Sequence, residues 1–174
     1  KVSGIELSSS RDLTNYALNK KVSAACELMS NENMSMVKNL SRITNGIYNF
    51  DAIVPPPLND SRYEYVQINA CSNPKCVTVD MGQVFTLKNV VAYNWPRMLN
   101  LQNMTMRENI IQISKDAITW RTVFNFSSQG DYPTFNGPQK ISFTTPKDAQ
   151  YVRQCIDGNL LDGNSTWFQI EAWG

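Results

Sequence analysis

Short strand-like segments limit the fold of this chain more than any other feature. Each segment is rich in β-branched and aromatic residues and is bounded by Gly, Pro, Asn or Asp, as strands of antiparallel sheets are. The segments are 76–82, 85–95, 109–116, 119–126, 140–145, 149–156 and 167–173. No run of twelve or more residues keeps a clean helical period, although 11–19 leaves room for a short helical turn. Short strands at regular spacing predict an all-β sandwich.

The last of these segments alternates in polarity. Phe168, Ile170 and Ala172 share one face of an extended chain, and Gln169 and Glu171 share the other. This pattern predicts a half-buried strand.

The length and charge of the chain bound its organisation. With 174 residues it is long enough for one domain with a full core and short for two. We predict a single domain over 1–174, with 1–15 as a lead-in. The net charge of +1 gives no sign of a basic nucleic-acid-binding surface, and no apolar run is long enough to cross a bilayer.

Residues 27–75 hold long polar connections, including a triple proline, and such connections on a sandwich are usually functional loops.

The sequence contains no histidine, which removes Ser-His-Asp and Cys-His catalysis and histidine-containing zinc sites. A zinc site made only of cysteines would need all four in two close pairs, and their spacing does not provide these. Asp157 and Asp162 form a pair of carboxylates, but they stand in a Gly- and Asn-rich stretch that is typical of a turn. We therefore predict that the chain is not an enzyme and holds no catalytic residues.

Six Asn-x-Ser/Thr sequons indicate an exported chain, because each is a potential glycan acceptor on a surface asparagine. They begin at Asn33, Asn39, Asn59, Asn103, Asn125 and Asn164. This number is several times what composition alone would give, so we predict a secreted or cell-surface glycoprotein.

An even cysteine count in an oxidising compartment predicts disulfides. Cys71 and Cys76 flank a Ser-Asn-Pro turn signal, which favours a short Cys71–Cys76 staple and leaves Cys26 for Cys155. Four cysteines allow three connectivities, and the other two remain open.

The order of several motifs resembles the discoidin, or coagulation-factor type C, family over about 16–174. The motifs are YALNKKVSAAC (16–26), RITNGIYN (42–49), CVTVDMGQVFTLKNVVAYN (76–94), IQISKDAITWRTV (111–123), DAQYVRQCIDGN (148–159) and FQIEAWG (168–174). The resemblance implies a galactose-binding-like jelly-roll β-sandwich. From the residues themselves, Asp116 and Ala117 predict a hairpin turn, Trp120 is expected in the core, and Arg153 is expected to be packed or paired.

Members of this family are usually non-catalytic and bind glycans, phospholipid head groups or proteins through loops at one end of the sandwich. The resemblance places these loops near 27–37, 48–66 and 95–107. We expect apolar tips and hydrogen-bonding or stacking groups there to contact the ligand. The candidate ligand-binding residues are Leu28, Met29, Met34, Arg62, Tyr63, Trp95, Arg97 and Met98. The simpler alternative is that these loops only cover one another.

Some relatives hold Ca²⁺ with an acidic turn and a glutamate in the final strand. This chain has Asn45 and Gln169 at those places, so we predict no cofactor and disfavour Ca²⁺. The absence of histidine also argues against the fucose-binding branch of the family.

Each of the three loops contains a sequon, and glycans attached there would hinder insertion of Leu28 or Met29 into a bilayer. We therefore disfavour membrane insertion, and phospholipid binding becomes the remotest alternative. The preferred partner is a glycan or an extracellular protein. The main alternative is a structural or adhesive subunit of a larger extracellular assembly that has no sugar site.

Overall fold

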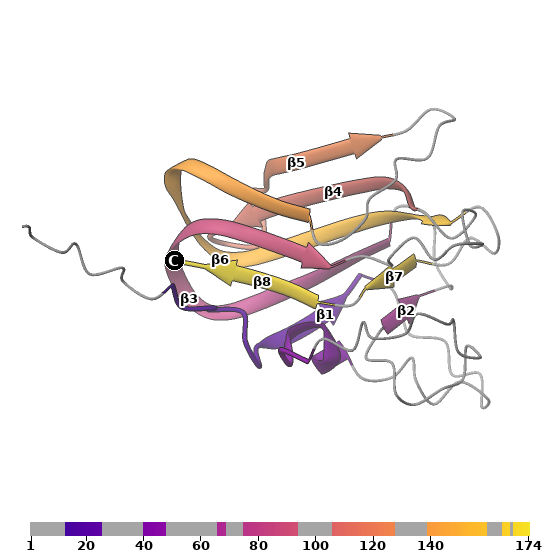
Figure 1. The fold of residues 1–174 in the computed structure, drawn as a ribbon, viewed down its shortest axis with the longest axis horizontal. Helices are drawn as coiled ribbons and strands as arrows, with labels where there is room; N and C mark the ends of the chain where they lie inside the picture. The colour runs from indigo at the N-terminus through magenta and orange to yellow at the C-terminus, as the bar shows by residue number, and fades with distance from the viewer. Residues whose placement is uncertain are drawn as a thin grey trace, which may run out of the picture.

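The computed structural model describes residues 13–25, 40–47, 66–68, 75–93, 106–127, 139–159, 165–167 and 169–174 (Figure 1). Within these residues strands dominate, and one short 3₁₀ helix, η1 (Leu40–Thr44), is the only helical element. The strands are β1 (Lys21–Ala24), β2 (Val66–Ile68), β3 (Lys75–Tyr93), β4 (Met106–Ser114), β5 (Arg121–Ser127), β6 (Gln139–Asn159), β7 (Ser165–Trp167) and β8 (Gln169–Trp173). The all-β prediction is confirmed.

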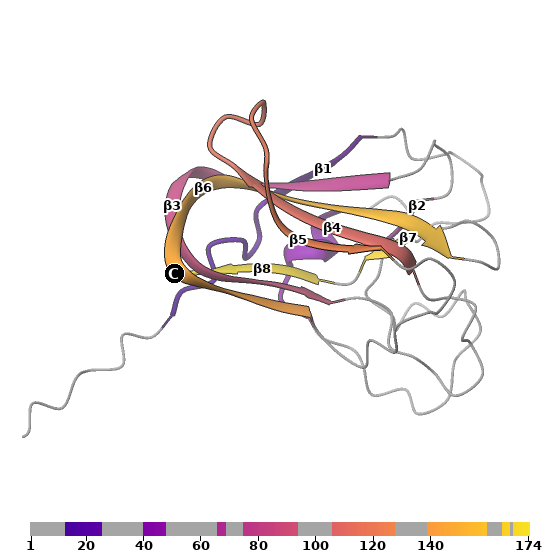
Figure 2. The same ribbon diagram turned by 90° about the horizontal axis from the view of Figure 1, so that it is seen from above.

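Two long strands, β3 and β6, bend together and so contribute to both layers of a sandwich (Figure 2). The first part of β3 pairs with the last part of β6, and the register shifts between Asp80 and Phe85, where the strands turn over. Gly82, with φ at +89°, lies in this bend, a backbone conformation that glycine adopts without steric cost. The main sheet has the order β1-β3-β6-β4-β5, with β8 beside β3, and β2 pairs with β7 separately.

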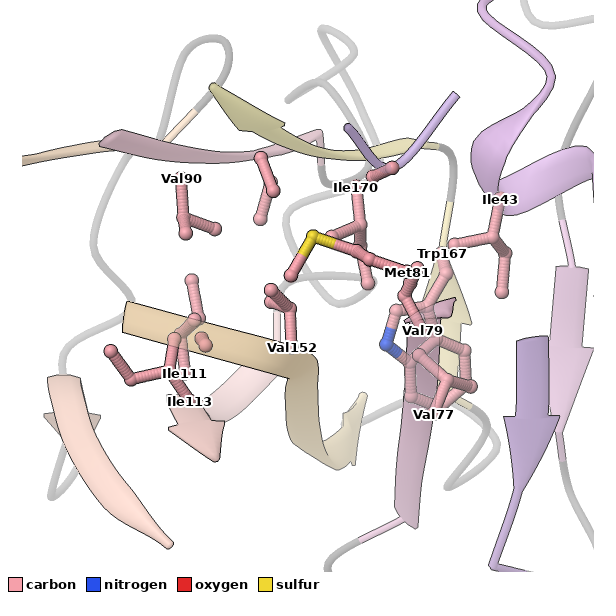
Figure 3. Close-up of a cluster of buried hydrophobic side chains, with 14 of the residues drawn as sticks. Ile43, Val77, Val79, Met81, Val90, Ile111, Ile113, Val152, Trp167 and Ile170 are labelled. Carbon is pink, nitrogen blue, oxygen red and sulfur yellow. The ribbon is translucent and has the colours of Figure 1, made fainter. Parts of the chain in front are cut away.

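The core lies between the two layers, and its labelled side chains point toward one another in Figure 3. Val77, Val79 and Met81 alternate along β3 and are fully buried, whereas the residues between them are partly exposed. Ile43 of η1 and Trp167 of β7 complete the cluster. Buried side chains from both layers meet in this core, which confirms the jelly-roll sandwich.

The expectation of a half-buried final strand is wrong. Gln169 and Glu171 of β8 are as buried as Ile170 and Ala172, with at most 3% of each exposed. Both polar side chains have hydrogen-bond partners, which is the condition for burying a polar group at low cost. Phe168 lies outside the described residues.

The placement of Trp120 in the core is also wrong. Trp120 is partly exposed just before β5, and its indole N–H donates to the Ala117 carbonyl oxygen at 3.1 Å. The guanidinium carbon of Arg153 lies 3.9 Å from the centre of the indole ring. Arg153 also donates from Nη2 and Nε to Oε1 of Gln112, at 2.6 and 3.0 Å. The prediction of a packed and paired Arg153 is therefore confirmed.

The favoured disulfide pairing is contradicted, because Cys76 is bonded to Cys155. The two residues face each other directly in the β3–β6 register, with their Cα atoms 4.0 Å apart. Cys76 belongs to a regular strand rather than to the preceding turn, which is why the Cys71–Cys76 staple failed as a prediction. Cys26 and Cys71 lie outside the described residues.

Candidate recognition end of the sandwich

Described strand ends meet at one end of the sandwich (Figure 1). Ala24 at the end of β1 faces Val77 near the start of β3, and Met106 at the start of β4 faces Asn159 at the end of β6. Because β3 folds back on itself, the end of β3 also lies at this end of the sandwich (Figure 2). These strand ends border the connections that the sequence analysis predicted to be the ligand-binding loops.

The candidate ligand-binding residues themselves lie outside the described residues, so each of them stays a prediction. They are Leu28, Met29, Met34, Arg62, Tyr63, Trp95, Arg97 and Met98. Of the six sequons, only Asn125 is described. It is exposed on β5, which ends the order of the main sheet, so its side chain is accessible to a glycan.

A turn after η1 is attached to β8 at the same end by Gln169. Three oxygens share the two N–H hydrogens of the Gln169 side-chain nitrogen, Nε2: the Asn45 side chain at 2.5 Å, the Arg42 carbonyl at 2.6 Å and the Ile47 carbonyl at 3.3 Å. Its Oε1 accepts from the backbone N–H of Gly46 at 3.2 Å. Gln169 faces Tyr93 in the β3–β8 register, so this turn is held beside the end of β3.

The residues of this turn do not fit a bound calcium ion. Calcium sites are built from oxygen ligands, usually with carboxylates among them. Here the side chains of Asn45 and Gln169 are neutral, and the N–H hydrogens of Gln169 face the oxygens that a cation would need. Elsewhere in the described residues, no group of three or more acidic or cysteine side chains could hold a metal ion.

Sequence reasoning missed a buried carboxylate, Glu171, which lies two residues after Gln169 on β8. Glu171 is 3% exposed, and its Oε2 accepts from the Trp173 indole N–H at 2.8 Å and from the Tyr93 hydroxyl at 3.5 Å. Burial raises the pKa of Glu171, and it also raises the pKa of the Tyr93 phenol. The Glu171 carboxyl thus anchors the last residue of β3. The even spacing of Gln169 and Glu171 suggested a solvent-facing pair and hid this role.

The opposite end of the sandwich carries the β4–β5 hairpin and an open cavity of about 540 Å³. Its lining is mainly polar and charged: Ile113, Ser114, Lys115, Asp116, Thr119, Arg121, Pro146, Lys147 and Asp148. Lys115 forms an ion pair with Asp148 at 3.0 Å. The residues that line this cavity carry both positive and negative charges, and no aromatic side chain is among them.

The hairpin turn beside the cavity follows the prediction for Asp116 and Ala117. Asp116 Oδ1 accepts from the backbone N–H groups of Ile118 at 2.9 Å and Thr119 at 2.8 Å. The hydrogen bond from Thr119, followed by that from Ile118, lowers the pKa of Asp116 to about 2. Ala117 has φ at +60°, which is uncommon for a residue with a Cβ.

The F5/8 type C domain model matches residues 59–170, more than half of the chain. The chain belongs to the F5/8 type C domain family. No curated protein sequence matches it significantly. The match includes the bent strands β3 and β6 and the hairpin between β4 and β5, so the resemblance found in the sequence is confirmed.

Solved structures with the same fold cover nearly the whole F5/8 type C chain. Chitosan-binding module 1 of a Paenibacillus sp. IK-5 chitosanase/glucanase is 22% identical, with a TM-score of 0.58 over 92% of this chain and 99% of that one. The family 32 CBM of Clostridium perfringens NanJ, in complex with galactose, is 13% identical, with a TM-score of 0.61 over 93% and 99%. The lectin domain of lectinolysin, complexed with Lewis B antigen, is 16% identical, with a TM-score of 0.62 over 91% and 95%. At these identities the similarity establishes the fold.

A search of the described part of the F5/8 type C chain for membrane-spanning helices finds none with the required length and apolar character.

Proposed function

We propose that residues 1–174 form one non-catalytic recognition domain that binds a glycan outside the cell, through the loops at the end of the sandwich where β1, β3, β4 and β6 meet. The observation that carries the proposal is this convergence of strand ends, which comes from the double bend of β3 and β6. A fixed scaffold with several loops leaving one end is a common way to build a binding site.

The residue types expected in those loops support sugar binding. Tyr63 and Trp95 offer aromatic faces, which pack on the apolar side of a sugar ring, and Arg97 offers a planar group of hydrogen-bond donors. The similar solved structures, named above as a chitosan-binding module, a complex with galactose and a complex with Lewis B antigen, support a glycan as the ligand class.

Two features support an extracellular location. The Cys76–Cys155 disulfide is of a kind that persists in oxidising compartments. The described sequon, Asn125, is exposed and therefore open to glycosylation. If Asn33, Asn59 and Asn103 also carry glycans, their bulk keeps the apolar loop residues out of a bilayer.

The proposal is tested on a glycan array with the protein produced in glycosylating cells. We expect selective binding that falls at least tenfold in Arg97→Ala and Tyr63→Ala. Arg121→Ala is the matched control, because it removes the same charge from the exposed start of β5 at the opposite end. Equal losses in all three variants would contradict a site in these loops.

The same preparations distinguish the alternatives. Binding to no glycan, together with comigration with other chains in native-size chromatography of the source material, would favour the structural-subunit alternative and refute the proposal. Tight binding of the fully glycosylated protein to phosphatidylserine liposomes would also refute it.

A further inference from the structure

We infer that the side-chain amide of Gln169 takes the place of a cation in the turn after η1, so that this end of the sandwich is fixed without a metal ion. The inference rests on the contacts of Gln169 and does not depend on which ligand the domain binds.

The first step is the convergence of oxygens on one nitrogen. Asn45 Oδ1, the Arg42 carbonyl and the Ile47 carbonyl all lie within 3.3 Å of Gln169 Nε2. These oxygens come from six consecutive residues, Arg42 to Ile47, which include the end of η1 and the turn after it, so one donor group holds this whole segment. Two carbonyls and one amide oxygen are also the hard ligands that Ca²⁺ accepts in proteins.

The second step is the orientation of the amide. Gly46 N–H points at Gln169 Oε1, while the three acceptors surround Nε2. Turning the amide over would place Oε1 against three oxygens and Nε2 against an N–H, which would lose every one of these hydrogen bonds. The network therefore fixes the N–H groups toward the position that a cation would occupy.

The third step is charge and burial. Gln169 is 1% exposed, and neither it nor Asn45 carries a charge. A buried cation needs negative ligands to compensate its lost hydration. The neutral amide satisfies the same oxygens without that requirement. A carboxylate at position 169 would instead face three oxygens with only one donor, the Gly46 N–H, and would need a cation.

This arrangement has a functional consequence. Gln169 faces Tyr93, the last residue of β3, so it positions the turn of residues 42–47 against the strand that leads into the 94–105 connection. Because no metal takes part, recognition at this end should be insensitive to chelators.

The test is thermal unfolding and calorimetric Ca²⁺ titration of the whole chain. For the wild type we expect no Ca²⁺ binding and the same Tm, within about 1 °C, in EDTA and in millimolar Ca²⁺. We expect Gln169→Glu to melt lower in EDTA and to gain about 5–10 °C when Ca²⁺ exceeds its Kd by 100-fold. Asn45→Asp is the matched control: it adds the same charge but keeps the Gln169 amide, so its Tm should not respond to Ca²⁺.

Two results would overturn the inference. One is stoichiometric Ca²⁺ binding by the wild type that raises its Tm. The other is a folded Gln169→Glu variant, judged by its wild-type circular dichroism, whose Tm ignores Ca²⁺. If Gln169→Glu does not fold, Gln169→Met decides: it keeps the length but removes the donors, and an unchanged Tm would show that the amide does not hold the turn.

Discussion

Removing the Cys76–Cys155 disulfide should cost several kcal/mol of the free energy of unfolding. The bond joins residues 79 apart in sequence. In the loop-entropy description, such a crosslink lowers the entropy of the unfolded chain by about 15 cal/mol/K, which corresponds to about 4.5 kcal/mol at 25 °C. A Cys71–Cys76 bond would close a loop of only five residues and contribute about 2 kcal/mol in the same description.

A double-mutant cycle separates these pairings. If Cys76 and Cys155 are partners, then Cys76→Ala, Cys155→Ala and the double variant should each lose roughly the same free energy of unfolding, about 4.5 kcal/mol. The assay is urea denaturation with free thiols blocked by alkylation. Single losses of about 2 and 5 kcal/mol that add up in the double variant would place the two cysteines in different disulfides and refute the observed pairing.

Three further predictions concern the β4–β5 hairpin and its surroundings. Hydrogen bonds from the backbone N–H groups of Thr119 and its neighbour lower the pKa of Asp116 to about 2, so the stability that they provide is present above pH 4 and is lost as the pH falls toward 2. Asp116→Asn should therefore flatten the dependence of Tm on pH between pH 4 and 2, and an unchanged dependence would contradict this prediction. Ala117→Gly should add about 0.5–1 kcal/mol to the free energy of unfolding, because glycine adopts φ near +60° without strain, and a loss of stability would count against the turn geometry. Arg153→Lys should cost about 1–2 kcal/mol and alter Trp120 fluorescence, since lysine cannot keep both the stacking and the forked hydrogen bonds, whereas wild-type stability and emission would show that these contacts contribute little.

The sequence predicted which segments are strands but not how they continue. Segment 76–82 and residues 85–93 of the next segment are parts of one strand, β3, and 140–145 and 149–156 are parts of β6. Turn-forming residues at these places indicated breaks between strands. In the folded chain the paired strands bend together and resume their hydrogen bonds after a register shift, which local composition does not encode.

Long-range partners explain the remaining differences. Gln169 and Asn45 are 124 residues apart in the chain, and burial of Gln169 becomes favourable only when that contact forms. The sequence did contain a signal for this contact, because Asn45 and Gln169 both depart from the same calcium-binding pattern. The pairing of Cys76 with Cys155 likewise follows from strand register, which spacing along the sequence does not determine.

The most direct test of glycan recognition by the loop-bearing end is hydrogen exchange of the glycosylated protein with and without the glycan that binds best on the array. We expect slower exchange in 27–37, 48–66 and 95–107, and no change in 113–121 at the hairpin end. Protection of 113–121 and 146–148 with unchanged loops would contradict the account, as would unchanged exchange throughout the chain at a saturating glycan concentration.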